Sequence, residues 1–105
     1  MQEYTLVFAP QAEEDLENIV VWLSEEVPEK VSEWIAFLRA DIDTLRMMPE
    51  RCGYAPENGL WGNEELRQLL FLRYPSQYRA IFTVYKDTVR ILHIRHGSRR
   101  YLHEE

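Results

Sequence analysis

The apolar residues between positions 12 and 45 recur at the spacing of a helix face, and this pattern limits the folds that the sequence can adopt. Two stripes recur every three to four residues, as on one face of a helix: Ala12, Leu16, Ile19, Val20 and Leu23 form the first, and Val31, Trp34, Ile35, Leu38, Ile42 and Leu45 the second. The first helix is predicted to end near Glu26, because Pro28 disfavours helical geometry in the residue before it. Pro28 suits the start of the second helix, which we expect to run to Met47 or Met48, before Pro49.

The break between these two helices is short, so we expect an antiparallel helical hairpin. Trp22 and Phe37 lie off the main stripes. Each either fills space within the hairpin or belongs to an exposed docking patch.

Four other runs are rich in residues that favour strands: residues 4–8, 66–72, 78–85 and 88–95. Lys86 and Asp87 join the last two runs as a two-residue hairpin turn, without the glycine that usually marks such a turn. Residues 49–63 hold two prolines and three glycines and are predicted to form a loop. The order β-α-α-β-β-β predicts an α+β fold, in which the helical hairpin packs on one face of an antiparallel sheet of three to four strands.

The length of the chain, 105 residues, predicts a single domain over residues 1–105. No run approaches the roughly eighteen apolar residues of a membrane span, and the start of the chain has no basic, apolar leader, so we expect no signal peptide. The single cysteine, Cys52, cannot form an internal disulfide, which favours a reducing cytoplasm. Motifs for zinc proteases and nucleotide binding are absent, and strand alternation separates His93 from His96, so we expect no metal or other cofactor.

Charge is distributed unevenly along the chain. Residues 66–103 carry eight Lys or Arg and one acid, whereas residues 1–65 carry four bases and fifteen acids; Glu104 and Glu105 complete the net charge of −6. Such asymmetry points to a polyanion or a charged protein as partner. Function is therefore sought in the basic part, which contains these arginines: Arg67, Arg73, Arg79, Arg90, Arg95, Arg99 and Arg100.

Arginine suits phosphate, because its guanidinium is permanently charged and binds bidentately. The alternative is that several of these arginines neutralise the acidic helices or contact an acidic protein partner. Alternation predicts two faces for each of the last two strands. Arg79, Ile81, Thr83 and Tyr85 share one face of residues 78–85, and Val89, Ile91, His93 and Arg95 share one face of residues 88–95.

Several segments together resemble the RelE/ParE toxin superfamily of bacterial type II toxin–antitoxin systems, which includes plasmid-stabilisation toxins. They are residues 4–16 (YTLVFAPQAEEDL), residues 45–50 (LRMMPE), residues 78–85 (YRAIFTVY) and residues 89–100 (VRILHIRHGSRR). The resemblance covers nearly the whole chain. It implies a small toxin that arrests growth, has no cofactor and is neutralised by a partner antitoxin. RelE-like members cut messenger RNA on the ribosome without a metal, and ParE-like members block DNA gyrase.

The resemblance also assigns site residues. Arg79 matches the arginine after the tyrosine in the RelE-type strand, and Arg99 matches the arginine two places after the glycine of the tail. In a nuclease these arginines would hold the scissile phosphate and stabilise the charge added by the attacking ribose 2′-hydroxyl. A proton carrier is also needed. His96 and Tyr101 are the candidates, although Tyr101 is not at the matching spacing and His96 is also suited to packing at a strand end.

Departures from the RelE pattern favour the ParE-like activity. The lysines that RelE-type nucleases place before the tyrosine–arginine strand are missing, since Lys30 and Lys86 are the only two, and a net charge of −6 disfavours binding to ribosomal RNA.

Three hypotheses follow. A gyrase inhibitor would use Arg67, Arg79, Arg95, Arg99 and Arg100 as its contact surface. A ribosome-dependent endoribonuclease would use Arg79 and Arg99, and an inactive toxin homologue would act as a binding module. In each case an antitoxin would bind by a helix in an apolar groove or by a strand added to the sheet.

Overall fold

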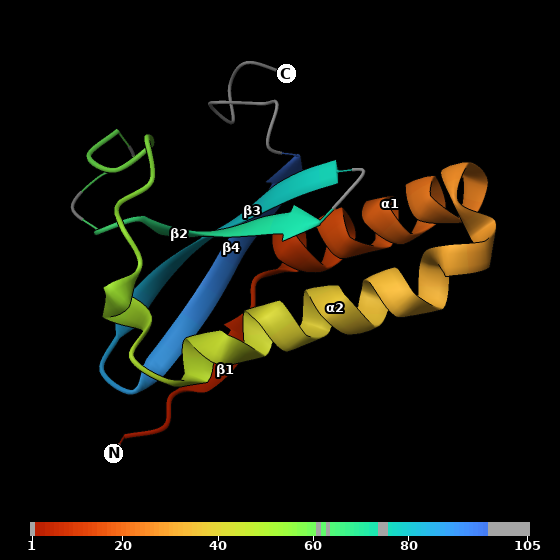
Figure 1. Ribbon diagram of the computed structural model, residues 1–105. Helices are drawn as coiled ribbons and strands as arrows, with labels where there is room; N and C mark the ends of the chain where they lie inside the picture. The colour runs from red at the N-terminus through yellow and green to blue at the C-terminus, as the bar shows by residue number, and fades with distance from the viewer. Residues whose placement is uncertain (1, 61, 63, 74–75, 97–105) are drawn as a thin grey trace.

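A four-stranded sheet carries a pair of helices on one face (Figure 1). The computed structural model describes residues 2–60, 62, 64–73 and 76–96. The strands are β1 (Thr5–Phe8), β2 (Arg67–Arg73), β3 (Ser76–Tyr85) and β4 (Thr88–His96), and they lie in the order β1-β4-β3-β2. This arrangement confirms the predicted α+β class and the order of the elements.

The sheet is mixed, which corrects the prediction of an antiparallel sheet. β2, β3 and β4 pair antiparallel, but β1 pairs parallel to β4, with Leu6 aligned to Val89 and Phe8 to Ile91. Parallel neighbours need a long connection between them. The two helices, the loop and the β2–β3 pair all lie between β1 and β4 in the chain, so this connection is available.

The helical hairpin consists of α1 (Pro10–Glu26) and α2 (Val31–Asp43), joined through a 3₁₀ turn at Pro28–Lys30. Pro10 and Pro28 each stand at the start of a helical segment, where the missing backbone N–H costs nothing. The end of α1 at Glu26 is as predicted. α2 ends earlier than predicted and continues as a 3₁₀ turn, Thr44–Arg46.

An extended residue, Met47, ends this helical segment, and a left-handed residue, Met48, then precedes a further 3₁₀ turn, Pro49–Arg51. Met48 has a φ of 49°, and the guanidinium of Arg51 donates hydrogen bonds to the carbonyl oxygens of Thr44, Met47 and Met48. Arg51 therefore adds side-chain donors to the carbonyl groups at this helix end, where those of Thr44 and Met48 also accept backbone N–H groups.

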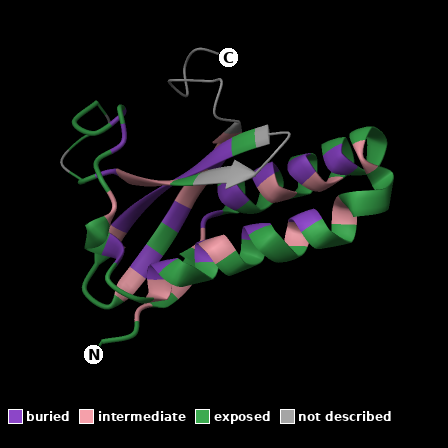
Figure 2. Ribbon diagram, in the orientation of Figure 1, coloured by how far each residue is buried: buried purple, intermediate pink, exposed green. Residues whose placement is uncertain are grey.

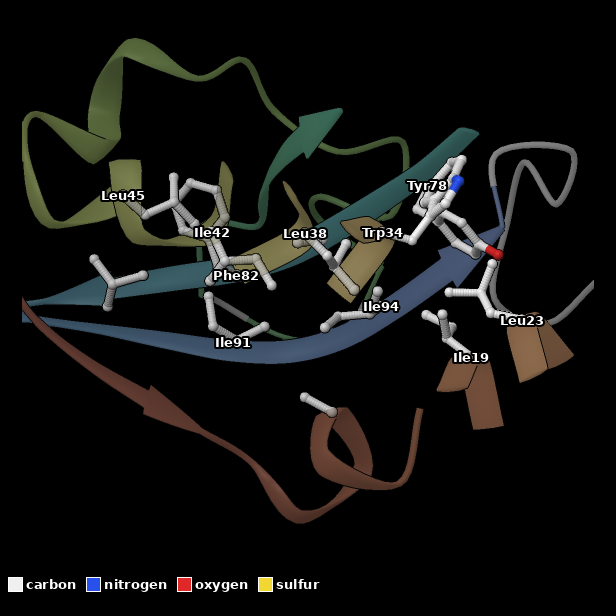
Figure 3. Packing of buried hydrophobic residues seen from close by; sticks show 13 residues of the cluster. Ile19, Leu23, Trp34, Leu38, Ile42, Leu45, Tyr78, Phe82, Ile91 and Ile94 are labelled. Carbon is white, nitrogen blue, oxygen red and sulfur yellow. The ribbon is translucent and has the colours of Figure 1, made fainter. Parts of the chain in front are cut away.

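The main core lies between the helices and the sheet (Figure 3). Leu38 and Ile42 of α2 and Leu45 of the following 3₁₀ turn belong to the same cluster as Phe82 of β3, which is fully buried, and Ile91 of β4. At the other end of the sheet, the rings of Trp34 and Tyr78 meet edge to face with centroids 6.4 Å apart. Trp22 and Phe37 remain 40% and 38% exposed at the margins of the hairpin.

A bulge in β4 changes which residues share a face. Ile81 pairs with His93 and Phe82 pairs with Ile91, so Leu92 is an extra residue in β4. Ile91 and Ile94 consequently both enter the main core, although simple alternation predicts opposite faces for residues three apart. The prediction that Val89, Ile91, His93 and Arg95 share one face is therefore wrong, because the bulge moves His93 and Arg95 to the face opposite that of Ile91.

We call the face of the sheet away from the helices the open face. Part of it is covered by the loop of residues 53–66, which contributes Ala55 and Leu66 to a small cluster with Ile81 and Leu92. Figure 2 shows buried segments both beneath the helices and where this loop meets the sheet. None of the helices in the described part of the chain is long and apolar enough to cross a membrane.

Candidate functional site

The open face gathers cationic side chains from two neighbouring strands. Arg79 of β3 lies directly opposite Arg95 of β4, and His93 of β4 lies opposite Ile81. Like charges that face each other across two strands destabilise a sheet unless an opposite charge offsets them. The partners of Arg79 therefore determine how much positive charge this face presents.

Arg79 is held by a carboxylate from the loop. Its Nη1 and Nη2 atoms donate to Oε1 and Oε2 of Glu57 at 2.9 and 2.7 Å, and Nη1 also lies 3.4 Å from Oε1 of Gln68. Arg79 is only 4% exposed and Glu57 is fully buried. Two parallel hydrogen bonds between a guanidinium and a carboxylate are the strongest form of this pair. The charge of Arg79 thus faces Glu57 within the protein, and its role in contacting a target stays a prediction.

Asp15 of α1 completes the edge of the sheet beyond the end of β1. Its Oδ2 atom accepts the backbone N–H of Ile94 at 2.9 Å, and its Oδ1 atom accepts a hydrogen bond from the side chain of Gln11. β1 ends at Phe8, so among the described residues this part of β4 has no neighbouring strand on that side, and the carboxylate takes the place of a strand carbonyl. A buried N–H without an acceptor would carry the full cost of desolvation.

Replacing Asp15 by alanine is therefore expected to lower the free energy of unfolding by about 1–3 kcal/mol. Asp15→Asn keeps an acceptor of the same shape and should lose clearly less. Urea unfolding measures both variants, and amide exchange at Ile94 reports the bond directly. Equal losses in the two variants would mean that the hydrogen bond to Ile94 does not stabilise the sheet edge.

His93 lies beside the same carboxylate, with its Nδ1 atom 3.8 Å from Oδ2 of Asp15. Burial lowers the pKa of His93 from its ordinary value of 6.5; nearby Asp15 opposes this shift and Arg95 adds to it. His93 therefore stays neutral in the folded chain at pH values where the same side chain is already protonated in the unfolded chain.

This difference predicts a pH dependence of stability. The unfolded state binds more protons than the folded state below pH 6.5, so the free energy of unfolding should fall as the pH falls from 6.5 through the lowered pKa of His93. His93→Gln should have a flatter profile than the wild type in urea unfolding over this range. Parallel profiles for the two proteins would contradict the lowered pKa.

Arg67 is engaged with the loop. Its guanidinium donates to the carbonyl oxygens of Glu50 and Cys52, the latter at 2.6 Å, and lies 4.4 Å from the ring centroid of Tyr54. The hydroxyl of Tyr54 donates in turn to Glu65. These contacts tie the loop to the first residue of β2, while the predicted role of Arg67 in target binding stays a prediction.

The remaining predicted site residues fall into two groups. Arg95 is half-buried on the open face and Arg90 is exposed near the β3–β4 turn. Arg99, Arg100 and Tyr101 lie outside the described residues, as do the side chains of Arg73 and His96. Within the described residues, no group of three or more His, Cys, Asp or Glu side chains is placed to hold a metal ion.

A second surface, an apolar groove of about 430 Å³, runs between β1 and the two helices. Its apolar lining comes from all three elements: Leu6, Phe8, Leu16, Val20, Ile35, Leu38 and Ile42. Four charged residues complete it, namely Glu13, Arg39, Asp43 and Arg46. The position of this groove was not predicted from the sequence, although Leu16, Val20 and Ile35 of its lining lie within the two apolar stripes.

Comparisons with known proteins agree with this architecture. The chain matches the model of a family described as the ParE toxin of the type II toxin–antitoxin system parDE, over residues 6–101. It is also similar to a solved structure described as the chromosomal ParDE TA system from P. aeruginosa, with a TM-score of 0.69 and 22% identity, covering 90% of this chain and 96% of that chain. A search of curated proteins gave no match. The structural likeness shows a shared fold, and the family match spans nearly the whole sequence. The chain belongs to the ParE toxin family of type II toxin–antitoxin systems.

Proposed function

We propose that this chain is a toxin that arrests growth by protein–protein contact, with DNA gyrase as its target, and that it does not cut messenger RNA. The observation that carries the proposal is the pair of Arg79 and Glu57. A nuclease of the RelE type would need the guanidinium of Arg79 to face a phosphate, whereas here both of its Nη atoms donate to a fully buried carboxylate.

The energetic cost of freeing Arg79 supports the same conclusion. Separating the partners of a buried ion pair leaves an uncompensated charge and costs about 3–5 kcal/mol. If Arg79 had to leave Glu57 in every turnover, this cost would offset much of the free energy that the guanidinium gains by binding a phosphate. The net charge of −6 adds a general repulsion from ribosomal RNA.

Two assays with purified chain separate the activities. We expect inhibition of DNA supercoiling by gyrase, and intact messenger RNA when the chain is added to translating ribosomes. Cleaved messages with unaffected supercoiling would favour the ribosome-dependent endonuclease. No effect in either assay, with normal growth during strong expression, would favour an inactive homologue that acts as a binding module.

We further propose that the cognate antitoxin lays an amphipathic helix in the groove between β1, α1 and α2. A helix presents an apolar stripe of the kind that such a groove accepts. Asp43 and Arg46 pair with each other at 2.6 Å, so Glu13 would face a basic residue of the partner and Arg39 an acidic one. Charges of this kind set association rate and partner choice, so association should slow as the salt concentration rises.

A further inference from the structure

The contact between the loop and β3 has the form of an occupied anion site. A guanidinium binds a carboxylate or a phosphate through the same pair of parallel N–H donors. On this chain both oxygens of Glu57 lie within 2.9 Å of the Nη atoms of Arg79, in a place that solvent does not reach. Glu57 therefore stands where an oxoanion ligand of Arg79 would stand.

Charged side chains from β4 and α1 lie near this pair. Arg95 lies opposite Arg79 on the neighbouring strand, and both arginines act electrostatically on His93 in the sense that disfavours its protonation. Glu57 also acts on His93, in the opposite sense, so the carboxylate and the two arginines lie within electrostatic range of one ring. Asp15 also acts on His93, in the same sense as Glu57, so two carboxylates accompany the two guanidinium groups around this ring. Removing Glu57 would take away one of these negative charges, and an oxoanion bound beside Arg79 would restore it.

The loop has other attachments to the sheet besides Glu57. The backbone N–H of Ala55 donates to the carbonyl of Leu66, the N–H of Leu66 donates to Oδ1 of Asn58, and the N–H of Gln68 donates to the carbonyl of Gly53. Ala55 and Leu66 also pack on Ile81. Removing the carboxylate of Glu57 would thus vacate the space beside Arg79 while these contacts still hold the loop in place.

We propose that Glu57 is the residue that determines what the open face can bind: its carboxylate occupies an arginine site that would otherwise take a phosphate group. This inference rests on the proposed function in one respect, since both treat Arg79 as withheld from RNA. Its test uses purified protein without gyrase or ribosomes, so the failure of one can be told from the failure of the other.

The test compares Glu57→Ala, the wild type and the double variant Glu57→Ala/Arg79→Met in thermal unfolding with increasing inorganic phosphate at constant ionic strength. A ligand that binds only the folded state raises the unfolding temperature progressively with its concentration. We expect this rise in Glu57→Ala and its absence in the other two proteins. Acetate, which replaces the missing carboxylate, should act in the same sense. In a second arm, stronger stabilisation by a short single-stranded RNA would identify a phosphodiester as the ligand, and equal stabilisation a free oxoanion.

Two results would overturn the inference. One is a folded Glu57→Ala that responds to phosphate no more than the wild type does. The other is an equal response of all three proteins, which would place binding at another basic group. If Glu57→Ala does not fold by itself, refolding from urea in phosphate or acetate is compared with refolding in chloride at the same ionic strength. Recovery of the folded signal in the oxoanions alone supports the site, and no difference between the salts rejects it.

Discussion

Glu57→Ala is expected to lower the free energy of unfolding by about 3–5 kcal/mol, which is a large part of the stability of a domain of this size. The substitution leaves the guanidinium of Arg79, which is 4% exposed, without the carboxylate that accepts two of its hydrogen bonds. Urea unfolding followed by circular dichroism measures the effect. Glu64→Ala is the matched control, because it removes an exposed acid from the same loop and should change stability by about 0.5 kcal/mol or less.

A double variant tests the reason for this loss. Replacing both partners with apolar residues of similar size, Glu57→Leu with Arg79→Met, removes the buried charges together and should recover most of the stability lost in Glu57→Ala. A double variant as unstable as the single one would show that the loss comes from packing of the loop. In that case the bidentate pair would not be the main source of stability at this position.

Ile35→Glu is expected to weaken binding of the cognate antitoxin by about 2–4 kcal/mol, which corresponds to about 30-fold or more in affinity. Ile35 is a half-buried residue on the lining of the groove, and a partner helix lying there would have to bury the new carboxylate without a counter-charge. Titration calorimetry with the antitoxin measures the loss. In cells, the variant should remain toxic when the antitoxin is co-expressed.

The control for this prediction is Ala36→Glu, which adds the same charge to the next residue of α2, at an exposed position outside the groove lining. It should bind the antitoxin with nearly wild-type affinity. If both variants bind equally well, the antitoxin does not use this groove. If both lose binding equally, the added charge acts at long range and the groove lining is not the determinant.

The helices and strands could be predicted because local patterns determine them. The two apolar stripes have the spacing of a helix face, and Pro10 and Pro28 stand at the first positions of helical segments, where proline fits best. The last two strands are rich in β-branched and aromatic residues and are joined by two residues. The parallel pairing of β1 with β4 could not be predicted in this way, because it depends on the path of the whole chain.

The faces of β4 were mispredicted for a specific reason. The side chains alternate between the two faces from Val89 to Ile91. The extra residue, Leu92, then moves each following side chain to the face opposite the predicted one. Nothing in the local sequence marks this position, since Leu92 lies in a continuous run of strand-forming residues. The bulge can be recognised only from the pairing of β4 with β3, because the consecutive residues Ile81 and Phe82 pair with His93 and Ile91.

The burial of Asp15 at the sheet edge and of Glu57 on the open face was not predicted either. The sequence pattern could have indicated the first of these but not the second. Asp15 lies three residues after Ala12 and four before Ile19, so its place on the inner flank of α1 could have been read from helical spacing. Glu57 lies in a loop with no periodicity. The path of the loop across the sheet determines which of its carboxylates contacts β3. Without that path, any acid in a loop is expected to be exposed to solvent.

The most direct test of the account is pulse-labelling of DNA and protein synthesis within minutes of inducing this chain in a bacterium that lacks the antitoxin. Contact inhibition of gyrase predicts that DNA synthesis falls first while protein synthesis continues and messages stay intact. An early collapse of protein synthesis with cleaved messages would contradict the account, because Arg79 would then have to leave Glu57 and act on RNA.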